Sequence, residues 1–207
     1  MGEIVNQVWE KELFYKENLV LKYKIAFPQL IRSRFRYGAQ KFNEYQYQKA
    51  SQLKEYCETE LLEDAKEAYE KQTVNGYPMR NYELLYEYEI TYKQNGVLSL
   101  YTDEYIDKGG AHGLTTRDSQ NWNLQNGKWI RLEDVFANKP YYIIDILKSI
   151  NKQIEERKYQ FFDNYCSLVQ DHLKMKNFYM TGKGIVIFFN PYEIAPYATG
   201  IPEFLIK

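Results

Sequence analysis

The fold is easiest to predict from IVIFFNPYEIAPYATG, residues 185–200, close to the C-terminus. Its first five residues form an apolar run that predicts a buried strand. Pro191 and Pro196 follow, and each fixes its φ at about −65° and favours an extended residue before it, so residues 190–200 are expected to form a stiff, non-helical loop. Such a loop holds aromatic side chains at little entropic cost, which suits a binding surface.

The candidate contact residues in this loop are Tyr192, Glu193, Tyr197 and Thr199. Tyrosines in a rigid turn also pack commonly against a core. Both interpretations of the two tyrosines stay open: they close the core, or they contact a partner. One ring can also be core while the other meets the partner.

The composition is that of a globular protein with many aromatic residues. Of 207 residues, 44% are hydrophobic, 27% are charged, and 21 Tyr, 11 Phe and 3 Trp make up 17%. The formal net charge is −1 without a block of like charge, which argues against nucleic acid as the main ligand, because phosphate binding needs a concentrated basic face. The sequence predicts neither a membrane span nor a signal peptide. Cys57 and Cys166 match no metal-ligand spacing, and they fit either one disulfide or two reduced thiols.

The first half of the chain predicts a strand, a long helix and a hairpin. Alternating apolar residues at 18–27 predict a strand, which we expect Pro28 to end. Apolar residues at the helical period over 42–69 predict one long helix, whose glutamates form a solvated face and which ends before Gly76. An Asn-Gly pair at 95–96, between two alternating runs that contain many tyrosines, predicts a β-hairpin.

The second half begins with another predicted hairpin. It covers residues 119–131 around Asn126-Gly127 and carries Trp122 and Trp129 near its turn. A short helical turn is predicted to follow at residues 132–136.

A longer helix is then predicted to begin at Asn138, the N-cap candidate, with Pro140 in its first turn. Its apolar stripe consists of Ile143, Ile146, Leu147, Ile150 and Ile154. A further helical piece is predicted over 162–173. A strand at 178–180 and a turn at 181–184 lead into the buried strand described above.

These patterns predict an α+β fold with antiparallel sheets and long helices packed on one face, arranged as two consecutive strand-helix-strand units. The N-terminal α+β unit is expected to cover residues 1–116, with the strand, the long helix and the tyrosine-rich hairpin. The C-terminal α+β unit is expected to cover residues 117–207, with the hairpin, the helices, the strand and the Pro/Tyr loop. We expect the two halves to share one sheet or to pack together.

His112 is a further candidate contact residue. It lies in the glycine-rich bend at 108–113, where three glycines let the backbone approach another segment closely. The bend is not a phosphate loop, because it lacks Gly-Lys-Ser/Thr and opens no helix. A histidine that only hydrogen-bonds its own loop fits the same position.

No catalytic constellation is recognisable in the sequence. No serine sits in a Gly-x-Ser-x-Gly elbow and no histidine pair has metal-ligand spacing, so we expect no catalytic residue, no metal and no cofactor. Asp103, Glu104 and Asp107 could join Glu193 in acid–base work or hold a cation. Carboxylates on the surface of an edge strand explain the same residues.

Several segments resemble a known family, most specifically from Gly109 onward. They are 109–113 (GGAHG), 121–124 (NWNL), 127–128 (GK), 132–136 (LEDVF), 178–179 (FY), 184–186 (GIV) and 189–200 (FNPYEIAPYATG). These segments are similar to the extracytoplasmic domain pair of RsiV-type anti-sigma factors, and the same pair resembles the N-terminal region of PdaC-type peptidoglycan deacetylases. The likeness covers nearly the whole chain, and the first half matches mainly in its strand, helix and hairpin.

The resemblance implies a domain in the cell envelope of a Gram-positive bacterium, outside the membrane and either tethered or secreted. In RsiV-type proteins this domain binds lysozyme, and binding exposes the anti-sigma factor to proteolysis that releases its sigma factor. The sequence shows no anti-sigma segment, membrane span or metal-binding deacetylase domain, so we expect either an excised ectodomain or a free-standing relative with a different role. We therefore expect membrane contact only through a segment absent from this chain.

The leading hypothesis is a non-catalytic sensor or binding module for signal transduction, with lysozyme or a similar wall-active protein as its ligand. The alternative is a module of a cell-wall deacetylase that binds peptidoglycan or another glycan, with Trp122, Trp129 and exposed tyrosines stacking on sugar rings. A third hypothesis is an enzyme that uses Glu193 or the carboxylates near the glycine bend. We expect no such activity.

Overall fold

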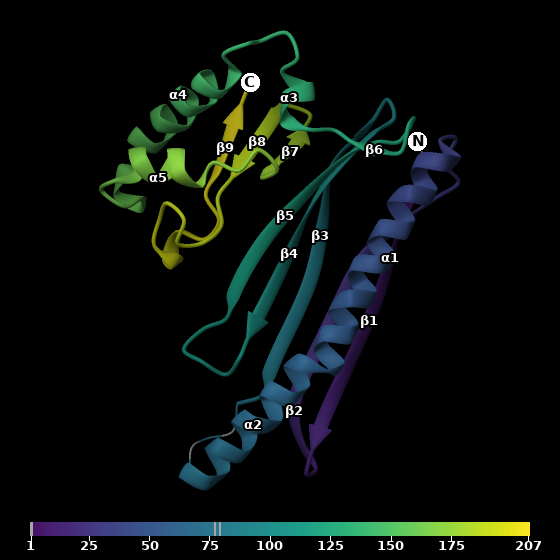
Figure 1. Cartoon of the computed structure of the whole chain (residues 1–207), viewed down its shortest axis with the longest axis vertical. Helices are drawn as coiled ribbons and strands as arrows, with labels where there is room; N and C mark the ends of the chain where they lie inside the picture. The colour runs from purple at the N-terminus through teal and green to yellow at the C-terminus, as the bar shows by residue number, and fades with distance from the viewer. Residues whose placement is uncertain (1, 77, 79) are drawn as a thin grey trace. The chain divides into compact units, whose positions relative to one another are not determined.

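The computed structural model describes residues 2–76, 78 and 80–207, which form two compact units. The N-terminal unit comprises Gly2–Tyr88 and Thr102–Thr115, and the C-terminal unit comprises Glu89–Tyr101 and Thr116–Lys207. A six-stranded sheet has the order β1-β2-β3-β4-β5-β6, and a three-stranded sheet has the order β7-β8-β9 (Figure 1). Strands β3, β4 and β5 contribute residues to both units.

Two long strands open the N-terminal unit. Strand β1 (Glu3–Tyr15) pairs antiparallel with β2 (Asn18–Ile31) along its whole length. Strand β1 was not predicted, because most of its side chains are exposed or half-buried and it carries no regular apolar alternation. Strand β2 is largely buried, as predicted, and pairs parallel with β3 over Leu21–Ile25.

The prediction that Pro28 ends its strand is wrong, since β2 continues to Ile31. Pro28 lies opposite Asn6 of β1, beyond the segment that pairs with β3. At Pro28, β2 is paired with β1 and not with β3. The missing N–H of Pro28 therefore costs no hydrogen bond to β3.

The predicted long helix is two helices in succession, α1 (Arg36–Glu58) and α2 (Glu60–Asn75). Thr59 interrupts them with φ −119° and ψ −90°, and its hydroxyl donates to the Glu55 carbonyl at 2.7 Å. The Thr59 N–H donates to the same carbonyl at 3.0 Å, so the hydroxyl shares this acceptor with the helical ladder. Gly76 ends α2 in the left-handed conformation, φ 67°, which confirms the predicted end.

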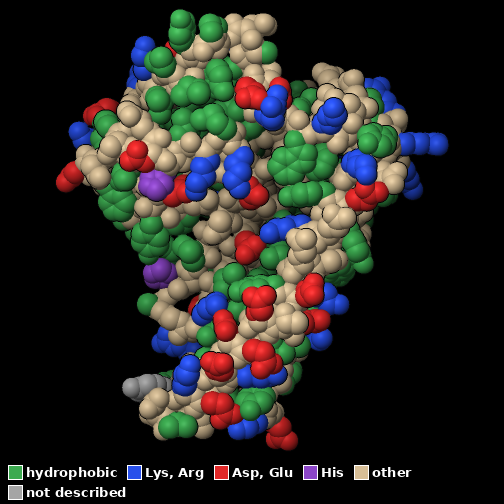
Figure 2. Space-filling model, in the orientation of Figure 1, with side chains coloured by type: hydrophobic (Ala, Val, Ile, Leu, Met, Phe, Trp, Pro, Cys, Tyr) green, Lys and Arg blue, Asp and Glu red, His purple; other side chains and the backbone are tan. Residues whose placement is uncertain are grey.

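One side of α1 and α2 packs on the sheet, and the predicted apolar stripe supplies its buried residues. They are Phe42, Ala50, Leu53, Cys57, Leu61 and Ala65. Of these, Ala50, Leu53, Cys57, Leu61 and Ala65 form one core cluster with Leu21, Tyr23, Ile25 and Phe27 of β2. Acidic side chains gather on the surface over α2 (Figure 2), which confirms the predicted solvated face.

Both predicted hairpins are present. Strands β3 (Tyr82–Gln94) and β4 (Val97–Asp107) are joined by Asn95 and Gly96, which have φ values of 51° and 84°. Positive φ at both positions is what a two-residue hairpin turn requires. Strands β5 (Leu114–Asn123) and β6 (Lys128–Trp129) form the second hairpin.

The C-terminal unit packs helices on one face of its small sheet. The strands are β7 (Phe178–Thr181), β8 (Gly184–Phe188) and β9 (Glu203–Ile206), all antiparallel. The helices are α3 (Leu132–Val135), α4 (Tyr142–Glu155) and α5 (Tyr165–His172), with the short 3-10 turns η1 (Lys158–Gln160) and η2 (Tyr197–Thr199). Residues of α4, α5 and all three strands make one core cluster.

The start of α4 differs from the prediction. The helix begins at Tyr142, not at Asn138, and Pro140 lies in the turn before it. The backbone N–H groups of Lys139 and Tyr142 close two successive turns, onto Phe136 and Lys139, before the helical ladder starts. Ile146, Ile150 and Ile154 are buried as predicted, whereas Ile143 lies in the first turn and is exposed.

The predicted α+β class is confirmed: β1 with β2, β5 with β6 and the strands of the small sheet pair antiparallel, whereas β2 pairs parallel with β3. Among the described residues, no helix is both long enough and apolar enough to cross a membrane.

Candidate binding site

The loop that follows β8 presents two stacked tyrosines. The rings of Tyr192 and Tyr197 lie 5.8 Å apart with an interplanar angle of 29°. Tyr192 is 53% exposed and Tyr197 is half-buried, whereas Ile194 and Ala195 between them are buried in the core. Tyr192 therefore does not close the core, whereas the half-buried Tyr197 leaves both interpretations of its own ring open. The loop packs through Ile194 and Ala195 and carries the stacked tyrosine pair on its more exposed side.

The first turn of the loop is held by hydrogen bonds of Asn190 and Glu193. The Asn190 amide pairs with the backbone of Arg117, accepting its N–H at 2.7 Å and donating to its carbonyl at 3.2 Å. A Glu193 carboxylate oxygen accepts the Asn190 N–H at 2.7 Å, and the other oxygen forms an ion pair with Lys174. These bonds fix the turn in which Tyr192 takes a positive φ of 68°.

Glu193 and Thr199, predicted as contact residues, therefore hold the loop. The Glu193 side chain is only 12% exposed and both its oxygens are engaged. The Thr199 hydroxyl donates to the Gln160 carbonyl at 2.8 Å, which ties the η2 turn to η1. The structure thus brings the four predicted loop residues together: Tyr192 is exposed, Tyr197 is half-buried, and Glu193 and Thr199 bond to other segments.

His112 lies in the N-terminal unit, in the bend between β4 and β5. Its Nδ1 is 2.9 Å from the Gly113 carbonyl oxygen. This contact fits the second interpretation of His112, a histidine that hydrogen-bonds its own loop. Two carboxylates before the bend also have partners: Glu104 is 3.8 Å from Lys49 of α1, and Asp107 accepts the Gly109 N–H at 2.8 Å. The bonds of Asp107 and His112 lie within the bend itself.

A polar stripe on β5, formed by Arg117, Ser119 and Asn121, was not predicted, and its Arg117 end bonds the loop. Arg117 forms an ion pair with Glu203 of β9 and stacks its guanidinium over Tyr101 at 3.6 Å. Tyr179 donates to the same Glu203 at 2.9 Å, and burial is the main cause that raises the pKa of this phenol. A signal was present in the sequence, because Arg117, Ser119 and Asn121 alternate at the strand period and so share one face of β5.

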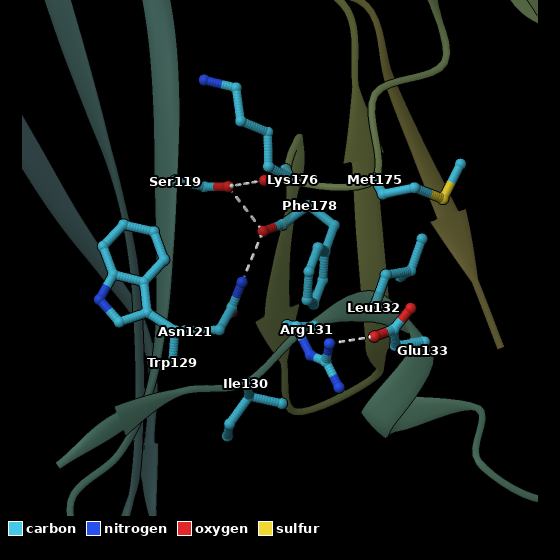
Figure 3. A pocket seen from close by; sticks show the side chains of 10 residues that line it. All are labelled: Ser119, Asn121, Trp129, Ile130, Arg131, Leu132, Glu133, Met175, Lys176 and Phe178. Atoms are coloured by element: carbon cyan, nitrogen blue, oxygen red, sulfur yellow. Dashed lines mark hydrogen bonds and ion pairs between the residues drawn. The ribbon is translucent and has the colours of Figure 1, made fainter.

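Ser119 and Asn121 continue this stripe to a second feature, a pocket of about 260 Å³. Both side chains are buried, and both donate to the Phe178 carbonyl, at 2.7 and 2.8 Å (Figure 3). Trp129 lies on one side of the pocket and Met175 and Leu132 lie on the other (Figure 3). The remaining lining residues are Ile130, Arg131, Glu133 and Lys176. The pocket joins an apolar lining to a small buried polar wall.

Among the described residues, no three His, Cys, Asp or Glu side chains lie close enough to hold a metal ion.

The two cysteines are free thiols in different surroundings. Cys57 of α1 is fully buried, and burial raises the pKa of its thiol to about 12, whereas Cys166 of α5 is exposed. Because the thiolate is the reactive form, we expect Ellman's reagent to modify one thiol per folded chain and two in denaturant. Cys166→Ser should abolish the reaction of the folded protein, and Cys57→Ser should leave it unchanged. Two reactive thiols in the folded chain would contradict the buried position of Cys57.

Two family models match successive parts of the chain. Residues 15–115 match Deacetylase PdaC, and residues 133–207 match a Protein of unknown function (DUF3298). The chain thus has a PdaC-like region followed by a DUF3298-like region, each matched over less than half of the chain. This confirms the PdaC part of the predicted resemblance, whereas the likeness to RsiV-type anti-sigma factors stays a prediction.

Curated relatives are similar at low identity. Peptidoglycan-N-acetylmuramic acid deacetylase PdaC of Bacillus subtilis is 22% identical over 160 residues, which are 76% of this chain and 34% of that protein. Immunogenic protein MPT64 of Mycobacterium tuberculosis is 22% identical over 119 residues, which are 58% of this chain and 52% of that protein. The chain therefore spans between a third and about half of the length of these relatives.

Solved structures share the fold. A DUF3298 family member from Bacteroides fragilis has a TM-score of 0.73 at 20% identity, covering 99% of this chain and 90% of that one. A DUF3298 family protein from Pseudomonas aeruginosa has a TM-score of 0.59 at 18% identity, covering 100% and 89%. At these identities the likeness shows the fold alone.

Proposed function

We propose that this chain, with its PdaC-like and DUF3298 domains, is a non-catalytic, extracytoplasmic binding module that recognises lysozyme or a similar wall-active protein. The observation that carries the proposal is the stacked pair of Tyr192 and Tyr197 on an anchored loop. The predicted resemblance to RsiV-type anti-sigma factors supplies the ligand class. In that role, occupation of the tyrosine pair would report the presence of lysozyme outside the cell.

The loop that carries the two tyrosines is preorganised for binding. Tyrosine combines a large apolar ring with a polar tip, and it is enriched at the sites in protein interfaces that contribute most to affinity. The bonds of Asn190, Glu193 and Thr199 already fix the backbone around both rings. A partner would therefore lose little entropy in ordering this loop.

Replacing Tyr192 with alanine is expected to weaken binding to hen egg-white lysozyme about thirtyfold, the effect of losing ~2 kcal/mol at a tyrosine anchor. Isothermal titration calorimetry of the purified chain measures this directly. Tyr197→Ala should weaken binding as well, because it removes both a contact and the ring on which Tyr192 stacks.

The matched control is Tyr159→Ala, since Tyr159 is 87% exposed in the same unit and belongs to η1. Its affinity should stay within about twofold of the parent chain. Equal affinities for Tyr192→Ala and the parent would exclude the tyrosine pair as the contact surface. The absence of any heat at tens of micromolar would exclude lysozyme as the ligand.

A second candidate function is a glycan-binding module associated with a cell-wall enzyme. The match of residues 15–115 to Deacetylase PdaC supports it, because the relative from Bacillus subtilis is described as acting on peptidoglycan. Sedimentation with purified peptidoglycan distinguishes the two candidates. Retention on the wall polymer without affinity for lysozyme would reverse their order.

A further inference from the structure

The pocket beside Trp129 is separate from the tyrosine pair, since the two share no residue. We propose that it binds the acetamido-bearing ring of an uncharged N-acetylated amino sugar within a glycan. This proposal rests on the cell-wall role proposed above and names the chemistry that the wall polymer would present.

The size of the pocket suits a single ring. Its volume of about 260 Å³ lies just below the roughly 300–1,000 Å³ that is usual for small-molecule sites. An extended oligosaccharide would therefore place one residue inside and the others along the surface.

The walls are amphipathic, as a sugar is. The Trp129 side chain is 41% exposed and is held against Trp122, with ring centroids 5.5 Å apart. An aromatic face, negative at its centre, attracts the weakly positive C–H groups on one face of a pyranose. Met175, Leu132 and Phe178 add apolar surface that would receive the acetyl methyl group.

The buried carboxamide of Asn121 provides polar recognition. Its Oδ1 accepts a hydrogen bond from the Ser99 hydroxyl at 2.6 Å, and its Nδ2 donates to the Phe178 carbonyl at 2.8 Å. Within the described part of the chain, these bonds use one lone pair and one N–H, and a carboxamide has two of each. The remaining donor and acceptor match the C=O and N–H of an acetamido group, and the lone pairs of Ser119 Oγ can also accept.

The charges around the pocket are balanced, which favours an uncharged ligand. Arg131 forms ion pairs with Glu133 and with Asp134, the second at 3.2 Å. Lys176 is 3.6 Å from Asp118. A phosphate or carboxylate would have to break one of these pairs, whereas a neutral N-acetylated sugar leaves them intact.

The test is a titration of the ¹⁵N-labelled chain with tri-N-acetylchitotriose, followed through the three tryptophan indole N–H signals. We expect a saturable shift of the Trp129 signal and no shift of Trp9, which lies in the other unit. Cellotriose, which is neutral and has no acetamido group, should bind at least about tenfold more weakly. No shift up to about 10 mM sugar, or equal binding of cellotriose, would overturn the proposal.

Variants locate the site and separate it from the lysozyme surface. Trp129→Ala, followed by isothermal titration calorimetry because it removes the reporter signal, should weaken chitotriose binding at least about tenfold. Met175→Ala, a change of a partly exposed side chain, should weaken it about threefold and keeps Trp129 as the reporter. Tyr192→Ala should bind the sugar like the parent chain while losing affinity for lysozyme. Sugar binding that survives Trp129→Ala, or that is lost in Tyr192→Ala, would place the site elsewhere and contradict the inference.

Discussion

Replacing Phe204 with alanine is expected to lower the free energy of unfolding of the C-terminal unit by about 3–5 kcal/mol. Phe204 of β9 is fully buried, and its ring centroid lies 6.0 Å from that of Phe161 and 5.9 Å from that of Phe189. The Arg157 guanidinium covers the same ring at 5.4 Å. Truncation would leave a cavity between helices and sheet that these neighbours fill only in part.

Urea unfolding followed by circular dichroism measures the effect. Phe14→Ala is the matched control, since Phe14 lies in β1 and is 58% exposed; it should change stability by less than about 1 kcal/mol. Similar losses in both variants would mean that Phe204 is not the centre of a packed core. The proposed binding of lysozyme should fall together with the folded fraction, because Phe189 and Ile194 anchor the tyrosine loop in the same core cluster.

Local sequence patterns predicted much of this fold correctly. The apolar run at 185–189 becomes β8, with Phe189 directly after it, and the Asn95-Gly96 turn closes its hairpin with positive φ at both residues. The buried stripe of α1 and α2 repeats at the helical period. In each case the residues that decide the structure are neighbours in the chain.

Features that depend on distant neighbours were not predicted. Strand β1 is stable because β2 pairs with it over its full length, although its own residues show little pattern. Pro28 stays within a strand because β3 does not reach it, and Ile143 is exposed because α4 begins four residues later than Asn138 suggested. Propensity gives way to tertiary context at these positions.

In the candidate site, too, features set by neighbouring residues were predicted and features set by distant residues were not. The prolines and tyrosines of the loop predicted a rigid aromatic turn, and the structure places Tyr192 against Tyr197. The inward roles of Glu193 and Thr199 could not be predicted, since their partners Lys174 and Gln160 lie in other segments. The residues that line the pocket come from three separate segments of the chain, so no local sequence motif predicts it.

Gly184→Ala is expected to destabilise the C-terminal unit by about 3 kcal/mol or more, although it adds a single methyl group. Gly184 opens β8 with φ 141°, a conformation that residues with a side chain rarely adopt. A Cβ at this position would overlap the backbone carbonyl oxygen of Ile206 in β9. A backbone atom cannot rotate away, so β9 would have to move, and Phe204 and Ile206 would leave the core with it.

The same turn provides the control. Gly182 has open space where its Cβ would be, so Gly182→Ala should change stability by no more than about 1 kcal/mol in either direction. Thermal and urea unfolding of both variants measure the difference. If Gly184→Ala is as stable as Gly182→Ala, β9 is not held against the start of β8. Phe189, whose N–H bonds to the Pro202 carbonyl, would then lack the strand that fixes the beginning of the tyrosine loop.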